Sequence, residues 1–310
     1  MKIKPSRLKK GETIGIVSPA RWMKEHELYK AASVFEQMGF RLKIASQNFL
    51  KQNQFAGNDD ERVKVIEEMF EDREVNAIIC AKGGYGSLRI VDMLNYDLIA
   101  RNPKIFIGYS DIDAILISIY EMTGLVTFHG PMLYSFIGEV DPFNITYLQH
   151  SICNPEPYKA EFSKTSQVKV LRAGIAEGEL FGGNLSILVN LIGTAHDFDT
   201  SGKILFIEDI DEYLYSLDRM LLHLRRASKL DKLAALIVGE MVNIKDNDIP
   251  FGKDVNEIIL DICRETDFPI ITNFPCGHGK HQLTIPISIK ARLECNERGV
   301  ILSLLESPIL

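Results

Sequence analysis

VNAIICA, residues 75–81, and KGGYGS, residues 82–87, together predict the fold class. The first segment is a continuous apolar run, which is typical of a strand that is buried on both faces of a sheet. The glycines of the second segment predict a tight turn, and residues 87–93 then follow with a helical pattern. A buried strand that leads through a short turn into a helix is the repeating unit of a parallel, doubly wound sheet.

The same unit recurs on both sides of this stretch. Before it, residues 13–18 form a short β-branched run, and residues 24–38 place their apolar side chains on one helical face. After it, residues 105–107 read as a buried strand and residues 111–122 as a helix. Strands that alternate with helices in this way predict an α/β fold with a doubly wound parallel sheet.

A change in composition between about residues 138 and 170 predicts a domain boundary. Prolines and polar residues gather there, which is typical of a linker. We therefore expect an N-terminal α/β domain at residues 1–150, a linker at 151–170 and a second domain at 171–310. The second domain is expected to contain strands at 203–207 and 233–238, helices at 185–191, 216–228 and 254–266, and a closing hairpin at 287–294 and 300–304.

Composition excludes several classes of protein. The chain has 310 residues, of which 46% are hydrophobic, and a net charge of −7 with no dense basic run, so we expect no nucleic-acid partner. No apolar stretch is long enough to cross a membrane or to act as a signal peptide. The five cysteines form no CxxC pair, which fits a reducing compartment, and we expect a cytoplasmic protein.

The glycine turn at residues 82–87 has two interpretations. It matches neither the phosphate-binding loop G-x-x-x-x-G-K-[ST] nor the dinucleotide fingerprint G-x-G-x-x-G. Glycines at the end of a strand allow a ligand to approach the backbone and allow amide groups to point at an anion. A tight turn that uses glycine for steric reasons alone fits the residues equally well.

Ser110 is the candidate nucleophile. It lies in Gly108-Tyr109-Ser110-Asp111, directly after the strand at residues 105–107, where a sharp turn would expose its hydroxyl. The full elbow pattern G-x-S-x-G is broken, because Ile112 stands in place of the last glycine. Taken alone, this segment favours Ser110 as the N-cap of the following helix over Ser110 as a nucleophile.

A serine nucleophile needs a base and an acid that orients the base. His278 lies in a glycine-flanked loop after an apolar segment, and His129 in Phe128-His129-Gly130-Pro131 is its rival. Glu208 follows the strand at 203–207, at the strand end that active-site residues favour. Three other acids crowd the same turn: Asp209, Asp211 and Glu212. The residues alone leave this choice open, and no histidine pair has the spacing of metal ligands.

Taken together, these motifs resemble the LD-carboxypeptidase (muramoyltetrapeptide carboxypeptidase) family of serine peptidases, which includes the microcin C self-immunity peptidases. The resemblance runs nearly end to end, in order and spacing. It is carried by the segments at residues 10–19, 82–89, 108–111, 128–132, 182–186, 207–209, 218–221 and 277–279.

The resemblance implies both a fold and a site. The fold is a flavodoxin-like N-terminal domain with a smaller C-terminal α/β domain. The implied triad is Ser110 as nucleophile, His278 as base and then acid, and Glu208 as the group that holds the imidazole. Backbone amides of Asp111 and of the Gly83-Gly84 turn are expected to form the oxyanion hole.

Lys82 departs from the family pattern, in which we expect arginine before the two glycines. A lysine keeps the positive charge but lacks the two-pronged geometry of a guanidinium. Asn184, in the turn Gly182-Gly183-Asn184, is a further candidate for substrate contact, although a turn residue chosen for its backbone geometry fits as well.

The implied activity is hydrolysis of the L,D amide bond that releases terminal D-alanine from murein tetrapeptides, without a cofactor or metal. A homodimer is common in the family.

One alternative is an immunity peptidase that cleaves peptidyl acyl-sulfamoyl adenylates. It would need an aromatic platform for the base, and the single tryptophan, Trp22, lies far from the expected region in sequence. Another alternative is a non-catalytic α/β protein that binds a small molecule at the glycine turn.

Overall fold

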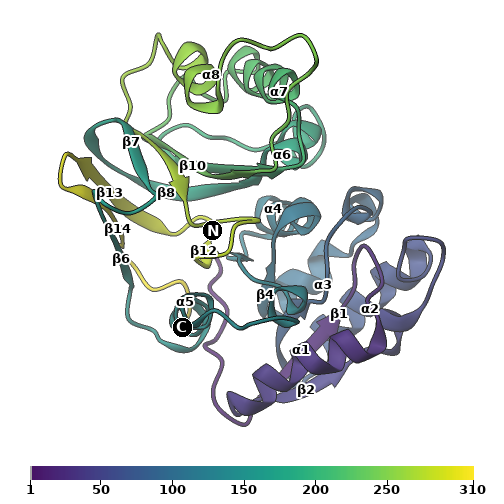
Figure 1. Ribbon diagram of the computed structural model, residues 1–310. Helices are drawn as coiled ribbons and strands as arrows, with labels where there is room; N and C mark the ends of the chain where they lie inside the picture. The colour runs from purple at the N-terminus through teal and green to yellow at the C-terminus, as the bar shows by residue number, and fades with distance from the viewer. Residues whose placement is uncertain (1) are drawn as a thin grey trace. The chain divides into compact units, whose positions relative to one another are not determined.

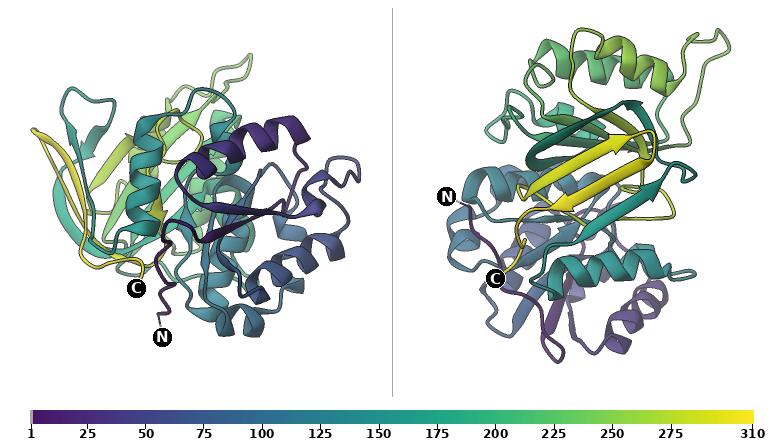
Figure 2. Two further views of the ribbon diagram at one scale, coloured as in Figure 1. Left: turned by 90° about the horizontal axis from the view of Figure 1, so that it is seen from below. Right: turned by 90° about the vertical axis from the view of Figure 1, so that its left-hand side faces the viewer.

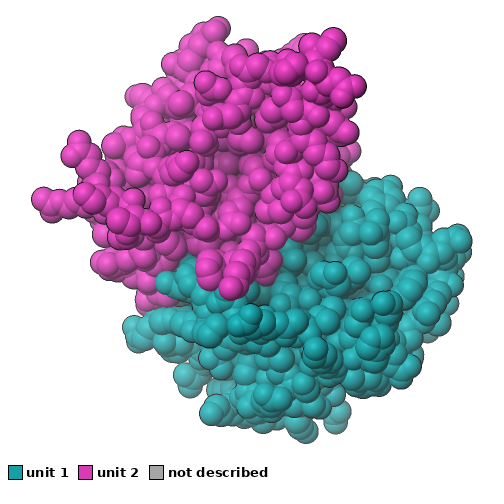
Figure 3. Space-filling model, in the orientation of Figure 1, with its two compact units in different colours: residues 1–156, 283–287, 307–310 teal, residues 157–282, 288–306 magenta. Residues whose placement is uncertain are grey.

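The computed structural model describes residues 2–310, which form two compact units (Figure 3). Unit 1 comprises the chain up to Glu156 together with residues 283–287 and 307–310. Unit 2 comprises residues 157–282 and 288–306. Among residues 2–310, no helix has the length and apolar character needed to cross a bilayer.

Unit 1 contains a six-stranded sheet in the order β12-β5-β4-β3-β1-β2 (Figure 1). Its strands are β1 (Thr13–Val17), β2 (Arg41–Ile44), β3 (Val75–Cys80), β4 (Ile105–Gly108), β5 (Phe128–His129) and β12 (Ile285–Pro286). Strands β1 to β5 are parallel, and β12 joins β5 in the antiparallel direction. The apolar run that predicted the fold class is β3, which lies inside the sheet.

The helices of unit 1 are α1 (Glu25–Gln37), α2 (Asp59–Glu71), α3 (Tyr96–Arg101), α4 (Asp113–Thr123) and α5 (Pro142–Cys153). The connection from β1 to β2 runs along the sheet in one direction, and those from β2 through β5 run in the other. Since such crossovers are right-handed, α1 and the group α2–α4 cover opposite faces, as the left view of Figure 2 shows.

Short 3₁₀ turns complete unit 1: η1 (Ser46–Phe49), η2 (Ser87–Arg89), η3 (Val91–Met93), η4 (Ser110–Ile112) and η5 (Leu133–Phe136). Residues 87–93, expected to form one helix, are η2 and η3. The amide of Ile90 donates to Ser87 and that of Met93 to Ile90, so each turn closes over three residues and no α-helix develops.

Unit 2 contains an eight-stranded sheet in the order β6-β14-β13-β8-β9-β10-β11-β7. Its strands are β6 (Lys159–Ser163), β7 (Lys169–Arg172), β8 (Gly174–Asn184), β9 (Ile204–Ile210), β10 (Ala235–Val242), β11 (Ile270–Phe274), β13 (Lys290–Asn296) and β14 (Gly299–Leu304). Strands β8 to β11 are parallel, and their neighbours toward both edges are antiparallel. The helices are α6 (Leu185–Leu191), α7 (Leu214–Arg226) and α8 (Val255–Ile262).

Residues 151–170 differ from the linker expected there. They hold the end of α5, all of β6 and the start of β7. Strand β6 pairs with β14, more than 130 positions further along the chain, so its polar residues lie on an exposed sheet edge. The polar composition that suggested a linker therefore belongs to edge strands. The predicted α/β class, a doubly wound parallel sheet followed by a second α/β unit, is confirmed.

Candidate active site

Ser110 begins η4, immediately after β4, in a strained conformation. Its φ angle is 63°, in the left-handed region that residues with a side chain rarely adopt. The chain turns so sharply there that a Cβ at Gly108 would overlap Cγ2 of Ile112. Backbone strain of this kind costs about 1–3 kcal/mol and clusters at active sites. The predicted sharp turn is therefore present, with Ile112 packed into it where the standard pattern has glycine.

The glycine turn lies against Ser110. A Cβ placed on Gly83 would lie 3.5 Å from the Cβ of Ser110, at normal contact distance. The buried carboxylate of Asp111 accepts hydrogen bonds from the backbone N–H of Gly86 at 3.2 Å and of Ser87 at 2.9 Å. The side chain that follows Ser110 thus fixes the glycine turn beside it. An oxyanion role for the amides of Gly83, Gly84 and Asp111 stays a prediction.

Arg62, on α2, also holds this turn, and it is not among the residues predicted from the sequence. Its side chain is fully buried, and its Nη1 donates to the carbonyl oxygens of Pro19 and Gly86. Its Nη2 pairs with Asp59 at the start of the same helix. Arg62 therefore ties the end of β1 to the glycine turn. An arginine on the apolar face of a helix, next to Val63, Val65 and Ile66, was the available signal.

In unit 2, Glu208 and His278 form a hydrogen-bonded pair. Glu208 is fully buried near the end of β9, and its Oε2 lies 2.7 Å from Nδ1 of His278. The His278 side chain retains 14% of its exposure. A carboxylate that accepts the Nδ1 proton leaves the basic lone pair on Nε2, which is the arrangement of a general base and the acid that orients it.

The approach of His278 to Glu208 requires glycine at position 277. Gly277 has a φ of +85°, and a Cβ there would overlap Oε2 of Glu208. Any larger residue would therefore displace the carboxylate from the imidazole. This explains in physical terms why the loop that carries the histidine contains glycine.

The other acids of the Glu208 turn have different partners. Asp211 is paired with Lys245 at 3.7 Å, and Glu212 accepts a hydrogen bond from Ser216. Asp209 is buried and accepts from the backbone N–H of Ser186 at 3.0 Å. Of the four acids at this turn, Glu208 is the one whose hydrogen bond to His278 the structure shows, and its role as the acid of a triad stays a prediction.

Asn184 connects Glu208 with Asp209. Its Nδ2 donates to Oε1 of Glu208 at 3.2 Å and to Oδ1 of Asp209 at 3.0 Å. Its Oδ1 accepts from Ile187 and thereby caps α6. The structure places Asn184 as a residue that positions the Glu208 carboxylate, and its role as a substrate contact stays a prediction.

His129, the rival base, lies in unit 1 and forms a separate pair. Its Nδ1 is 2.8 Å from Oδ1 of Asp113, and both side chains are almost completely buried. Its ring also meets that of Tyr109 edge-on, with centroids 6.1 Å apart. Such burial suits a residue that supports the turn at Ser110 better than one that exchanges protons with a substrate.

Asp209 predicts a pH dependence of stability. Burial, followed by the charge of Glu208, raises its pKa to about 7. The folded state then holds the proton more tightly than the unfolded state, whose carboxyl has a pKa near 3.9. The resulting stabilisation is present below about pH 4 and is lost as the pH rises to about 7. We expect the free energy of unfolding of the wild type, relative to Asp209→Asn, to fall by roughly 2 kcal/mol between pH 5 and 8.

Urea unfolding of both proteins at several pH values measures this difference. Asp211→Asn is the matched control, because it makes the same chemical change on the same turn at an exposed side chain. Its difference from the wild type should stay constant over the same range. A pH-independent difference for Asp209→Asn would contradict the prediction.

Comparison with known proteins identifies the family. Residues 14–130 match the LD-carboxypeptidase N-terminal domain, and residues 177–293 match the LD-carboxypeptidase C-terminal domain. A probable murein peptide carboxypeptidase of Bacillus subtilis is 37% identical over 96% of this chain and 94% of its own length. The chain belongs to the LD-carboxypeptidase family. The family resemblance found in the sequence is thereby confirmed.

A solved structure and a second relative agree with this assignment. The crystal structure of a muramoyltetrapeptide carboxypeptidase from Oxalobacter formigenes is 29% identical, with a TM-score of 0.86, covering 94% of this chain and 98% of that one. The microcin C7 self-immunity protein MccF of Escherichia coli is 28% identical over 94% of this chain and 92% of its own length. The predicted enzyme class, a serine-type LD-carboxypeptidase, is confirmed by membership of this family.

Proposed function

We propose that this LD-carboxypeptidase releases the terminal D-alanine of murein tetrapeptides by hydrolysing the amide bond to the preceding L-centre, in peptidoglycan recycling. The observation that carries the proposal is the Glu208–His278 pair, in a chain that also presents a strained serine on a strand-to-helix turn. The 37% identity to a probable murein peptide carboxypeptidase supports the choice of substrate.

The proposed chemistry uses Ser110, His278 and Glu208 as a triad. The Oγ of Ser110 attacks the carbonyl carbon of the scissile amide, and Nε2 of His278 takes the hydroxyl proton. The tetrahedral oxyanion receives hydrogen bonds from the amides of Asp111 and of Gly83 or Gly84. Collapse of this intermediate breaks the C–N bond, and the imidazolium protonates the departing amine of D-alanine.

The second half of the reaction consumes water. His278 takes a proton from the water molecule as it attacks the acyl-enzyme, and then returns a proton to Ser110 as the tripeptide leaves. Glu208 stays ionised and stabilises the imidazolium formed in each half. No metal or organic cofactor enters these steps. Because the nucleophile belongs to unit 1 and the pair to unit 2, the proposal requires both units for turnover.

We further propose that the protein works in the cytoplasm as a homodimer, with the murein peptide as its partner and without nucleic acid or membrane. All five cysteines are free thiols, which suits a reducing compartment. The dimer rests on the family resemblance. Size-exclusion chromatography with light scattering tests it, and a mass of one chain, about 35 kDa, would contradict it.

The direct test of function is incubation of the purified protein with murein tetrapeptide. We expect D-alanine and tripeptide to appear in equal amounts, as measured by mass spectrometry. A tetrapeptide that ends in L-alanine is the control and should remain intact. No release from the D-terminated peptide under any condition would contradict the proposal.

The similarity to MccF makes a second candidate specific. A peptidase of that kind would cleave a peptidyl acyl-sulfamoyl adenylate at the same serine. Parallel measurement of kcat/KM for this conjugate and for murein tetrapeptide decides between the two. We expect the tetrapeptide to be the better substrate, and the reverse order would favour the immunity function.

A further inference from the structure

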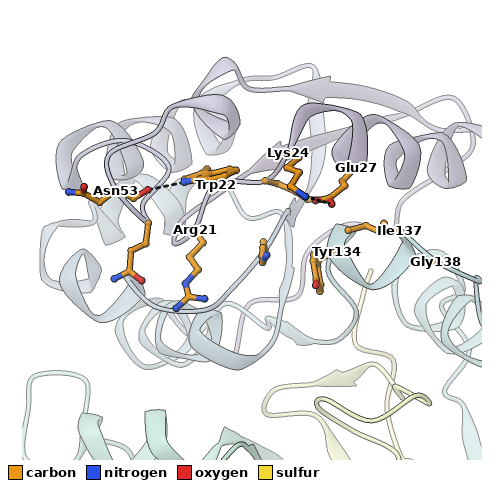
Figure 4. Close-up of a pocket in the computed structure, with 11 residues that line it drawn as sticks. Arg21, Trp22, Lys24, Glu27, Asn53, Tyr134, Ile137 and Gly138 are labelled. Atoms are coloured by element: carbon orange, nitrogen blue, oxygen red, sulfur yellow. Dashed lines mark hydrogen bonds and ion pairs between the residues drawn. The ribbon is translucent and has the colours of Figure 1, made fainter.

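Unit 1 contains a cavity of about 730 Å³ at the carboxyl ends of its strands (Figure 4). The loops that follow β1, η1, β3 and β5 contribute its walls, which include Arg21, Trp22, Lys82 and Tyr134. The cavity lies where the strand order reverses, between β1 and β3. Doubly wound sheets bind their ligands at such switch points.

The cavity carries an excess of positive charge. Three cations line it, Arg21, Lys24 and Lys82, against the single acid Glu27. Glu27 is already paired with Lys24 at 3.3 Å. Within residues 2–310, Arg21 and Lys82 have no carboxylate at ion-pair distance. These two positive side chains are therefore available to bind an anion from outside the chain.

Lys82 is held in place by an aromatic wall. Its Nζ lies 4.3 Å from the centre of the Tyr134 ring, a cation–π contact that orients the ammonium group. Burial, followed by the nearby charge of Arg21, lowers the pKa of Lys82. Both effects disfavour the ammonium form, and the negative charge of a bound carboxylate would offset them.

The cationic cavity adjoins the proposed nucleophile within unit 1. Lys82 directly precedes Gly83, the residue that lies against Ser110. The next residue, Gly84, packs on Arg21, since a Cβ there would lie 2.5 Å from the Cδ of that side chain. In this turn, Gly83 therefore contacts Ser110, and the next residue, Gly84, contacts the side chain of Arg21.

We infer that Arg21 and Lys82 form a subsite for a carboxylate of the peptide substrate. The inference rests on the proposed function and extends it to the recognition of the substrate. A carboxypeptidase must hold a free carboxylate one residue beyond the scissile carbonyl, so a cationic group next to the nucleophile suits it. A diamino acid with its own carboxylate would offer the same chemistry from a second source.

The test measures binding on an inactive background, so that it does not depend on turnover. Isothermal titration calorimetry gives the Kd of murein tetrapeptide for Ser110→Ala, alone and combined with Lys82→Met. We expect Lys82→Met to raise the Kd about tenfold to a hundredfold, because a charge-assisted hydrogen bond is lost. Lys82→Arg keeps the charge and should restore most of the affinity.

Lys51→Met is the matched control. Lys51 stacks over the ring of Trp22 at 4.4 Å but does not line the cavity, so the same loss of charge occurs next to the site. We expect a change in Kd of less than about twofold. Thermal unfolding of all variants verifies that each one folds.

Altered peptides identify which carboxylate binds. If the terminal one does, a C-terminal amide weakens binding to the Ser110→Ala protein and Lys82→Met adds no further loss. If the diamino acid supplies it, replacing diaminopimelate by lysine has that effect instead. The inference is overturned if Lys82→Met changes the Kd of every peptide equally, or changes the Kd of no peptide. It is also overturned if the protein binds adenosine monophosphate in preference to the peptides and that binding depends on Lys82. Carboxylate-dependent binding without turnover by the wild type would overturn the proposed function and leave the subsite standing.

Discussion

Ser110→Ala is expected to lower kcat by at least about 10⁴-fold, which is the loss typical of a removed nucleophile. Binding of the tetrapeptide should change little, because the hydroxyl contributes to bond-making and not to holding the peptide. Steady-state kinetics of D-alanine release measure the loss, and calorimetry on the same variant measures binding. Activity within tenfold of the wild type would rule out Ser110 as the nucleophile.

The backbone at Ser110 calls for a particular control, because the substitution is made at a residue whose positive φ already strains the chain. Ser228 has a φ of 58° at an exposed position after α7. Ser228→Ala therefore makes the same change in the same backbone conformation, away from the proposed chemistry. We expect full activity from it and a comparable small loss of stability. An equal loss of activity in both variants would show that strain, and not the missing hydroxyl, is responsible.

Glu208→Gln is expected to lower kcat by about 10³- to 10⁴-fold with little change in KM. A neutral amide neither selects the Nδ1–H tautomer of His278 nor stabilises the imidazolium that forms during turnover. The shape of the side chain is nearly unchanged, so the loss reports on charge and proton position. Comparison of kcat and KM with those of the wild type checks the prediction.

Glu212→Gln provides the matched control for Glu208→Gln. It makes the same substitution on the same turn, at a carboxylate that accepts a hydrogen bond from Ser216. We expect its kcat to stay within about twofold of the wild type. If Glu208→Gln were as active as this control, the Glu208–His278 pair would have a structural role only.

The fold of unit 1 was predictable from the sequence because its signals are local. The apolar run of β3 and the glycines after it lie within thirteen consecutive residues, and each strand-turn-helix unit repeats the pattern. The edge strands of unit 2 were not predictable in this way. Strand β6 is polar and short, and it is a strand only because β14 lies beside it.

In the candidate site, too, the features with local sequence signals were predictable and those that depend on distant residues were not. The position of Ser110 after a strand and that of His278 between glycines are local features, and both were found from the residues. The choice of Glu208 among four acids came from the family resemblance and not from the pattern. The role of Arg62 was not predictable from local patterns, because its partners, Pro19 and Gly86, lie 43 and 24 positions away.

The sequence by itself determined the α/β class, the nucleophile candidate and the glycine turn beside it. These follow from hydrophobicity and backbone preference over a few neighbouring residues. Only the tertiary structure decided that Glu208 bonds His278, 70 positions along the chain, and that Arg62 and Asp111 hold the glycine turn. Such contacts depend on which strands lie side by side, and the order of strands in a sheet is a property of the packed chain as a whole.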